Sequence, residues 1–443
     1  MKRLFDNLSA DITSSKKLGF KFFIIGIFLL ASAPALSGIF LFLALVIGSL
    51  KRSDSYFRDK WNYLFLAGGI FMVISSCVSL FSTSAAYREI WDPSLSWIGL
   101  LNWLPFFWCF WGFQPYLLTS NTRKICALCF VAGSIPVLIT GFGQYWMGWH
   151  GPFQLFNGLI IWFQRPIHEM QGLTGLFNNS NYAGSWLTIV WPFCLAALLQ
   201  PSLNIFRRII VFSISSSFVT AIILTNSRNA WGGLLFPIPF VLGPSNWSWL
   251  VPISLLVLFP IFTAIVPFAP SGFQDWARTV VPERIWVRFS EEFSEFENYP
   301  RARLDIWKNA IKFISDKPLF GWGAAAFAVL YRLLGETGYR QEHTHNLPFE
   351  LAFGYGIPAS LFIFANIFAL LIFSLRKSLF FNNKLPNTDI ESSLFARAWW
   401  SSSLFLLCSH MLDIPYFDAR ISIAFWILLA GLRGLIRESS EYN

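Results

Sequence analysis

Charged residues are what this sequence has least of. Asp, Glu, Lys and Arg make up 13% of its 443 residues, and 55% of the residues are hydrophobic. In a soluble domain, about a quarter of the residues are charged. Apolar runs of at least about 18 residues recur along the chain, and each is long enough to cross the roughly 30 Å hydrocarbon core of a bilayer. The composition therefore excludes a soluble protein and indicates a polytopic membrane protein.

Cysteines are few as well, and none is in a polar segment. All six lie inside apolar runs. Cys126 and Cys129 have CxxC spacing, but inside a hydrophobic span we expect them to be small packing residues. The sequence thus predicts neither a disulfide framework nor a zinc site.

The net charge of +9 would suit a nucleic-acid partner only if the basic residues were clustered on a soluble surface. Here they lie in loops beside apolar spans, where membrane topology accounts for them. We therefore expect membrane lipids as partners and no nucleic acid.

The apolar runs predict an all-α polytopic membrane protein with about twelve transmembrane helices. Residues 1–268 hold helices 1–9, residues 269–345 form a large extracytoplasmic loop with amphipathic helices, and residues 346–443 hold helices 10–12 and a cytoplasmic tail. Together they form one integral membrane domain. The expected spans are two within 18–50, then 61–83, 97–118, 125–147, 182–200, 208–225, 229–243, 248–268, 346–375, 394–412 and 420–437.

Lys and Arg set the orientation of these spans. With the N-terminus cytoplasmic, the short cytoplasmic segments hold most of the basic residues. The short outer connections then hold only Arg88, Arg165, Arg228 and Arg420. Both termini are therefore expected to be cytoplasmic, and the loop 269–345 is expected to face outward.

The second half of that loop has helical periodicity. Leu304, Trp307, Ile311 and Ile314 recur at i, i+3, i+7 and i+10, which predicts an amphipathic helix that begins near Arg303 and stops before Pro318. Such a helix could lie on the membrane surface and cover the spans below it.

Four polar features fall on the outer side of the predicted topology. His345 and Asn346 open the tenth span, Arg303 heads the loop helix, Arg228 lies at a corner between two spans, and Asn181 ends a polar run before the sixth span. Arginine presents a fixed fork of donors that suits phosphate oxygens, and histidine can take a proton near neutral pH. This combination would suit a reaction on a lipid-linked phosphate.

Each residue also has a simpler interpretation. Arg228 could snorkel to lipid headgroups, Arg303 could belong to a solvated helix face, and His345 with Asn346 could cap a helix. His343 is expected to be an ordinary loop residue. Glu350, on the same helix face as Asn346, would need a partner or a water-filled cavity.

Three further charged residues lie in the last outer connection. Asp413, Asp418 and Arg420 could pair with one another.

At these residues the sequence resembles the O-antigen ligase/polymerase superfamily, whose members share the Wzy C-terminal domain. His345-Asn346, nine residues and then Gly356 match its H-[NSQ]-x9-G motif. Arg303-x-x-x-Trp307 followed by Pro318-x-x-Gly321-x-Gly323 is similar to its R-x-x-x-W…P-x-x-G-x-G segment. The run Ser227-Arg228-Asn-Ala-Trp231 resembles its S-R-[GA]-A-[WF] corner, and the run that ends at Asn181 resembles its G-x-x-x-N-x-N segment. The chain departs from the pattern at Asn229 and Ala359.

The resemblance implies a GT-C-like glycosyltransferase in the cytoplasmic (inner) membrane, with its active site facing the periplasm and no metal or other cofactor. The donor would be a glycan on undecaprenyl diphosphate, and the acceptor a sugar hydroxyl on lipid A core or on another glycan. Arg228 and Arg303 would hold the diphosphate, and His345 would deprotonate or orient the attacking hydroxyl. The residues expected to bind substrate are Asn346, Glu350, Asn181, Arg165 and Trp307.

Three other functions remain open from the sequence. A polysaccharide polymerase of the same superfamily would use the same residues. A bicarbonate or solute transporter should carry ionisable groups near the bilayer midplane and two related halves, and this sequence shows neither. A purely structural assembly partner would have no use for Arg303 and His345.

Overall fold

The computed structural model describes the chain except for short segments near the termini and in several loops. The described residues are 16–51, 55–82, 85–158, 160–162, 164–167, 172–201, 203–266, 268–290, 303–334, 341–380 and 390–438. Parts of the predicted outer loop, residues 291–302 and 335–340, thus lie outside them.

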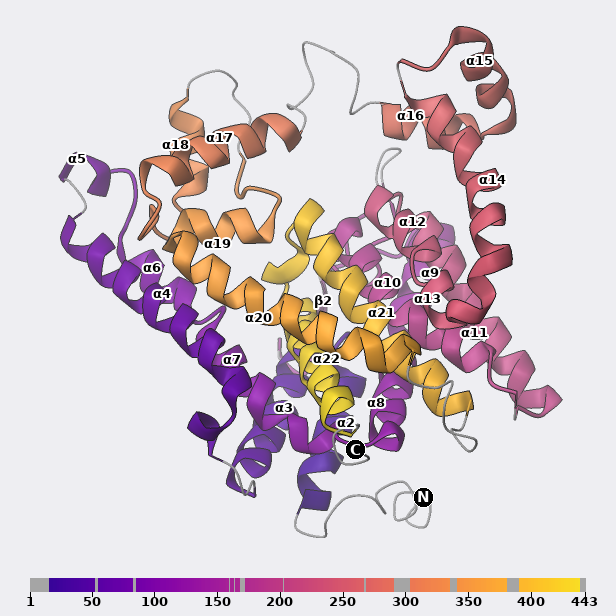
Figure 1. Ribbon diagram of the computed structural model, residues 1–443, viewed down its shortest axis with the longest axis horizontal. Coiled ribbons are helices and arrows are strands. Elements are labelled where there is room, and N and C mark those ends of the chain that lie inside the picture. The colour runs from indigo at the N-terminus through magenta and orange to yellow at the C-terminus, as the bar shows by residue number, and fades with distance from the viewer. Residues whose placement is uncertain are drawn as a thin grey trace.

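Helices dominate the fold (Figure 1). In the first half of the chain they are α2 (Lys17–Leu29), α3 (Pro34–Leu50), η2 (Tyr56–Arg58), η3 (Lys60–Asn62), α4 (Tyr63–Ser82), α5 (Ala85–Arg88), α6 (Ser94–Leu100), α7 (Leu104–Gly112), η4 (Gln114–Tyr116), α8 (Ser120–Gly133), α9 (Ile135–Met147), α10 (Ser180–Leu198) and α11 (Ile205–Leu224). The second half contains α12 (Arg228–Leu235), α13 (Ile238–Leu242), η5 (Pro244–Asn246), α14 (Trp247–Ile265), α15 (Ser271–Val280), α16 (Glu283–Ser290), α17 (Arg303–Asp316), α18 (Phe327–Leu333), α19 (Leu347–Tyr355), α20 (Ile357–Leu375), the π-helical η6 (Arg376–Phe380), α21 (Ile390–Leu412), η8 (Pro415–Phe417) and α22 (Ala419–Glu438).

The all-α class predicted from the apolar runs is confirmed, with one small addition. Strands β1 (Phe153–Leu155) and β2 (Ile160–Trp162) form an antiparallel hairpin in which Phe153 pairs with Trp162. Nothing in the apolar pattern indicates this hairpin.

Six helical segments in the described chain are long and apolar enough to cross a membrane. The number of twelve spans therefore stays a prediction. The six segments are Lys60–Phe81, Ser120–Met147, Ile205–Leu224, Pro244–Ile265, Ile357–Leu375 and Ala419–Glu438.

The core lies around α10, α21 and α22, which carry the fully buried side chains of Trp186, Trp399 and Trp426. Of the most apolar 18-residue stretch in each segment, 72% is buried in α22 and 17% in the segment that contains α14. Helix α14 packs mainly on α15 and α16 and stands at one side of the molecule (Figure 1). Since its long apolar side chains are exposed, as for Leu256, we expect lipid to surround it.

The predicted span 346–375 is not one continuous helix. It breaks at Gly356, whose φ is +94°, between α19 and α20. A Cβ at this position would lie 2.0 Å from the carbonyl oxygen of Leu319, so the close approach of two backbones requires glycine. Helix α19 is thereby separated from the span α20.

A helix that begins at Arg303 and ends before Pro318 is confirmed as α17, but the apolar face predicted for it is wrong in part, because Leu304 and Ile311 are exposed. Its buried face, which includes Ile306 and Phe313, packs over α19. The end of α22 lies at the opposite end of the molecule from α15 and α17 (Figure 1). The large loop therefore covers one end of the bundle.

The segment that follows α17 runs along the end of α19. The N–H groups of Trp322 and Gly323 donate to the carbonyls of Phe353 (2.8 Å) and Gly354 (3.0 Å). A Cβ on Gly321 would lie 2.4 Å from the carbonyl oxygen of Phe353. The glycines of the P-x-x-G-x-G pattern thus allow the segment after α17 to lie against the end of α19.

Candidate active site

His345 lies at the turn into α19. Asn346 caps this helix, because its side chain accepts a hydrogen bond from the N–H of Phe349 at 3.0 Å. His345, one residue earlier, has a φ of +53°, which is uncommon for a residue with a Cβ. The expected helix cap is therefore present at Asn346, and His345 lies just outside the helix.

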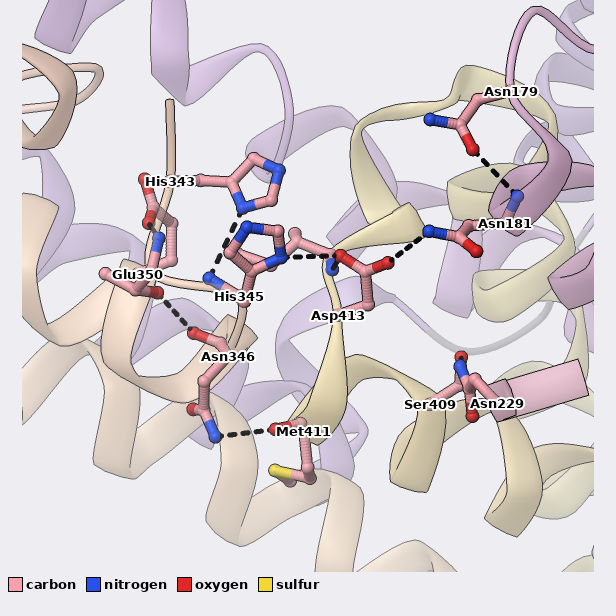
Figure 2. A network of polar contacts seen from close by, with 12 residues as sticks. Asn179, Asn181, Asn229, His343, His345, Asn346, Glu350, Ser409, Met411 and Asp413 are labelled. Carbon is pink, nitrogen blue, oxygen red and sulfur yellow. Dashed lines mark hydrogen bonds and ion pairs between the residues drawn. The ribbon is translucent and has the colours of Figure 1, made fainter. Parts of the chain in front are cut away.

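A buried carboxylate holds the His345 ring (Figure 2). Asp413, which follows α21, accepts a hydrogen bond from Nδ1 of His345 at 3.0 Å and another from the N–H of Ile414 at 2.8 Å. Its other oxygen accepts from Nδ2 of Asn181 at 3.4 Å. With Asp413 ionised, the proton of the neutral ring belongs on Nδ1, which leaves Nε2 as an acceptor.

The pKa of Asp413 is lowered. Burial acts to raise it, but the hydrogen bond and charge of His345, the N–H of Ile414 and the charge of Arg303 together outweigh burial. Asp413 is therefore a carboxylate at neutral pH.

The pairing considered for the last outer connection is present in part. Asp418 alone pairs with Arg420, through contacts of 2.5 and 2.8 Å, whereas Asp413 turns to His345. The guanidinium of Arg420 also donates to the carbonyl of Leu176 at 2.9 Å. Arg420 thereby fixes the loop that precedes α10, and α10 itself carries Asn181.

A second bond joins the start of α19 to the end of α21. Nδ2 of Asn346 donates to the carbonyl of Met411 at 2.9 Å. The two helices are therefore held together by this bond as well as by the His345–Asp413 contact.

His343 is not an ordinary loop residue. Its Nδ1 accepts the N–H of His345 at 3.3 Å, and the two ring centroids are 4.2 Å apart. Burial lowers the pKa of His343 to about 4, helped by the charges of His345 and Arg303 and opposed by Asp413. The ring is thus neutral at neutral pH and packs beside His345.

Glu350 has the partner that its position requires. Its Oε2 accepts the N–H of Thr344 at 2.9 Å, while Oγ1 of Thr344 donates to the carbonyl of Asn346. Burial raises the pKa of Glu350 to about 7, and the bonds from Thr344 oppose this increase. The native protein therefore binds this proton more strongly than the unfolded chain does, so stability is lost as pH rises from about 4.5 to about 7.

The structure brings Arg303 to the histidine pair. Its charge at the start of α17 lowers the pKa of both His343 and Asp413. Arg303 is itself partly exposed, and its charge acts on the half-buried His343 and on the buried Asp413.

Arg228 begins α12 beside the same end of α21. The neighbouring Asn229 donates from Nδ2 to Oγ of Ser409 at 2.5 Å, and Ser409 lies one helical turn before Asp413 (Figure 2). The corner also contacts the loop before α10, since a Cβ on Gly172 would lie 1.8 Å from the carbonyl oxygen of Thr225.

The two remaining predicted residues differ in position. Trp307 meets Phe349 edge-on, with centroids 6.3 Å apart, so it contacts the first turn of α19. Within the described chain its buried Nε1 has no hydrogen-bond partner. Arg165 is exposed, and its carbonyl accepts from Gln144 at 2.6 Å. None of the contacts among described residues joins Arg165 to His345.

A pocket of about 620 Å³ lies beside His343 and Glu350. Its walls come from α6, α18, α19 and the first turn of α10, and they include the aromatic side chains of Tyr182, Tyr355 and Phe417. An apolar, aromatic cavity with a few polar groups at one end is the usual form of a small-molecule site.

Asp413, which contacts His345, is the residue of this candidate site that sequence reasoning did not select. The available signal was a carboxylate directly after a long, nearly uncharged helix, where an unpaired charge is costly. His343, His345 and Asp413 are also possible metal ligands, since one donor atom of each lies within 4.8 Å of the others.

Residues 213–364 match a family model described as O-antigen ligase. The matched segment contains Arg228, Arg303 and His345, whereas Asn181 and Asp413 lie outside it. No curated protein matches the chain.

Proposed function

We propose that the chain, whose residues 213–364 match a family model described as O-antigen ligase, is a membrane protein of the O-antigen ligase/polymerase superfamily and transfers a glycan from undecaprenyl diphosphate to a sugar hydroxyl, as a ligase. The observation that carries this proposal is the His345–Asp413 pair within the electrostatic reach of Arg303. We place the reaction at the periplasmic face of the inner membrane, where both substrates are anchored or accessible.

The reaction exchanges one bond at the anomeric carbon. The acceptor hydroxyl oxygen bonds to this carbon, the bond to the diphosphate oxygen breaks, and the hydroxyl proton goes to Nε2 of His345. Asp413 faces the imidazolium that forms and keeps Nδ1 protonated throughout. General-base help of this kind is typically worth about 10²–10⁴-fold in rate.

Undecaprenyl diphosphate is the leaving group, so its developing charge needs stabilisation. Arg228 begins α12, which packs on α21, and Arg303 begins α17, which packs on α19. The guanidinium groups of both arginines suit bidentate contact with phosphate oxygens. Stabilisation of charge by fixed donors usually lowers the barrier of such a reaction more than any other effect. We therefore propose that the arginines replace a metal ion, and that chelators leave the rate unchanged.

The acceptor sugar would occupy the pocket beside His343 and Glu350. Its aromatic walls suit the faces of a sugar ring, and its polar end includes His343, whose ring packs against that of the proposed base. Donor phosphate and acceptor sugar would then approach His345 from opposite sides. Asn346, Glu350 and Trp307 support this arrangement from α19 and α17, and Asn181 does so through Asp413.

Purified protein should transfer glycan from a lipid diphosphate donor to an acceptor sugar, with release of undecaprenyl diphosphate. His345→Ala should reduce the rate by about 10²–10⁴-fold while donor binding persists. His150→Ala, in an exposed loop, is the matched control and should behave as wild type. A His345→Ala protein that is folded and transfers glycan at the normal rate would exclude His345 as the base.

A further inference from the structure

Two histidines and one aspartate come together from distant parts of the chain. His343 and His345 precede α19, and Asp413 follows α21. One donor atom of each lies within 4.8 Å of the other two, and the histidine rings are 4.2 Å apart. This set differs from a cluster of surface acids, because two of the three donors are imidazoles and the third is a buried carboxylate.

The loop is built so that both histidines turn to the same side (Figure 2). Thr344 between them is fully buried, and it is fixed by bonds to Glu350 and to the carbonyl of Asn346. Because the middle residue points inward, the rings of His343 and His345 lie together on the side of Asp413. The arrangement is therefore fixed by the backbone.

The donor set selects the class of cation. Imidazole nitrogens suit Zn²⁺, Cu²⁺ and Ni²⁺, whereas Mg²⁺ and Ca²⁺ prefer oxygen ligands only. Bonds of about 2.1 Å in a tetrahedral zinc site place the donors about 3.4 Å apart. The present donors, which lie within 4.8 Å of one another, would have to approach by up to about 1.4 Å, which rotation of the partly exposed His345 side chain (26% exposed) can supply. Asn181 would hold the second carboxylate oxygen of Asp413 from outside.

We propose that His343, His345 and Asp413 bind a zinc-class divalent cation, and that the bound ion blocks glycan transfer. The inhibitory part rests on the proposed function, in which His345 is the base. An ion on the His345 ring competes with proton transfer, and an ion on Asp413 removes the contact that fixes the ring. The nearby charge of Arg303 opposes the cation, so the site is expected to release it to a chelator.

Binding is tested on full-length protein without a polyhistidine tag, stripped with EDTA and titrated with zinc by calorimetry. One zinc per chain is expected, and no magnesium binding. His343→Ala and Asp413→Asn should each weaken zinc binding by at least about tenfold. His150→Ala should bind like wild type. Absence of zinc binding, or wild-type affinity in His343→Ala, would overturn the proposal.

Inhibition is tested separately on the transfer rate. Zinc should inhibit the wild type, EDTA should restore the rate, and His343→Ala should be at least about tenfold less sensitive relative to its own metal-free rate. If EDTA abolishes transfer and zinc restores it, the ion is required and the inhibitory role is wrong. If zinc binds as expected but no glycan is transferred under any condition, the metal site stands and the proposed function fails.

Discussion

Asp413→Asn removes a negative charge from the proposed active site while keeping the shape of the side chain. The amide oxygen can still accept the Nδ1 proton of His345, so the ring keeps its position. Two unit charges about 4 Å apart are worth about 4 kcal/mol at an effective dielectric constant of 20. Asp413 is 11% exposed, so we take about 3 kcal/mol as the lost stabilisation of the imidazolium. That corresponds to about 100-fold in rate.

The assay is steady-state glycan transfer by purified protein, with the donor and the acceptor varied in turn. In Asp413→Asn, kcat should fall about 100-fold, while KM for the lipid-linked donor stays within about twofold because Arg228 and Arg303 are intact. Asp418→Asn is the matched control, since its carboxylate pairs with Arg420 and not with the histidine. Thermal unfolding of both variants separates loss of catalysis from loss of folded protein.

Two results would refute the reasoning about Asp413. One is a folded Asp413→Asn protein that keeps more than half of the wild-type kcat. The other is an Asp418→Asn protein, equally stable, that loses as much activity as Asp413→Asn. In either case the hydrogen bond to His345 would only be structural.

Arg303→Lys keeps the charge but loses the bidentate fork, so KM for the donor should rise and kcat/KM should fall at least about tenfold. A variant with the same KM and kcat/KM as wild type would mean that Arg303 belongs only to a solvated helix face. Glu350→Gln should gain stability over wild type as pH rises from 5 to 8, by up to about 3 kcal/mol; pH-independent differences in thermal unfolding would exclude a raised pKa. Asn346→Ala loses a helix cap and the bond to Met411, so thermal unfolding should show a loss of about 1–2 kcal/mol; an unchanged melting temperature would show that the cap is dispensable.

The features predicted correctly from the sequence are local ones. The helix from Arg303 follows from the spacing of its apolar residues, although Leu304 and Ile311 of that set are exposed. The start of α19 follows from the polar pair His345 and Asn346, which was expected to cap a helix. Both signals depend on neighbours in the chain. The break at Gly356 was not predicted, because the run around it is apolar on both sides and only the approach of Leu319 requires a glycine.

The contact between His345 and Asp413 could not be predicted for a different reason. The two residues are separated in sequence by the helices α19, α20 and α21. From the sequence alone, Asp418 could equally well pair with Arg420 or with a histidine. Only the packing of α19 against α21 decides which carboxylate reaches which base. His343 was misjudged for the same reason, since its burial depends on elements far along the chain.

The carboxylate that fixes His345 lies beyond residue 364, where the match to the family model ends. A fragment confined to the matched segment would retain both arginines and the histidine and yet lack Asp413, the Met411 carbonyl and Asn181. The segment that matches the family model is thus shorter than the set of elements that form the proposed active site. Truncations, chimaeras and domain transplants made from this protein should therefore keep α10 and α21 together with the recognisable segment.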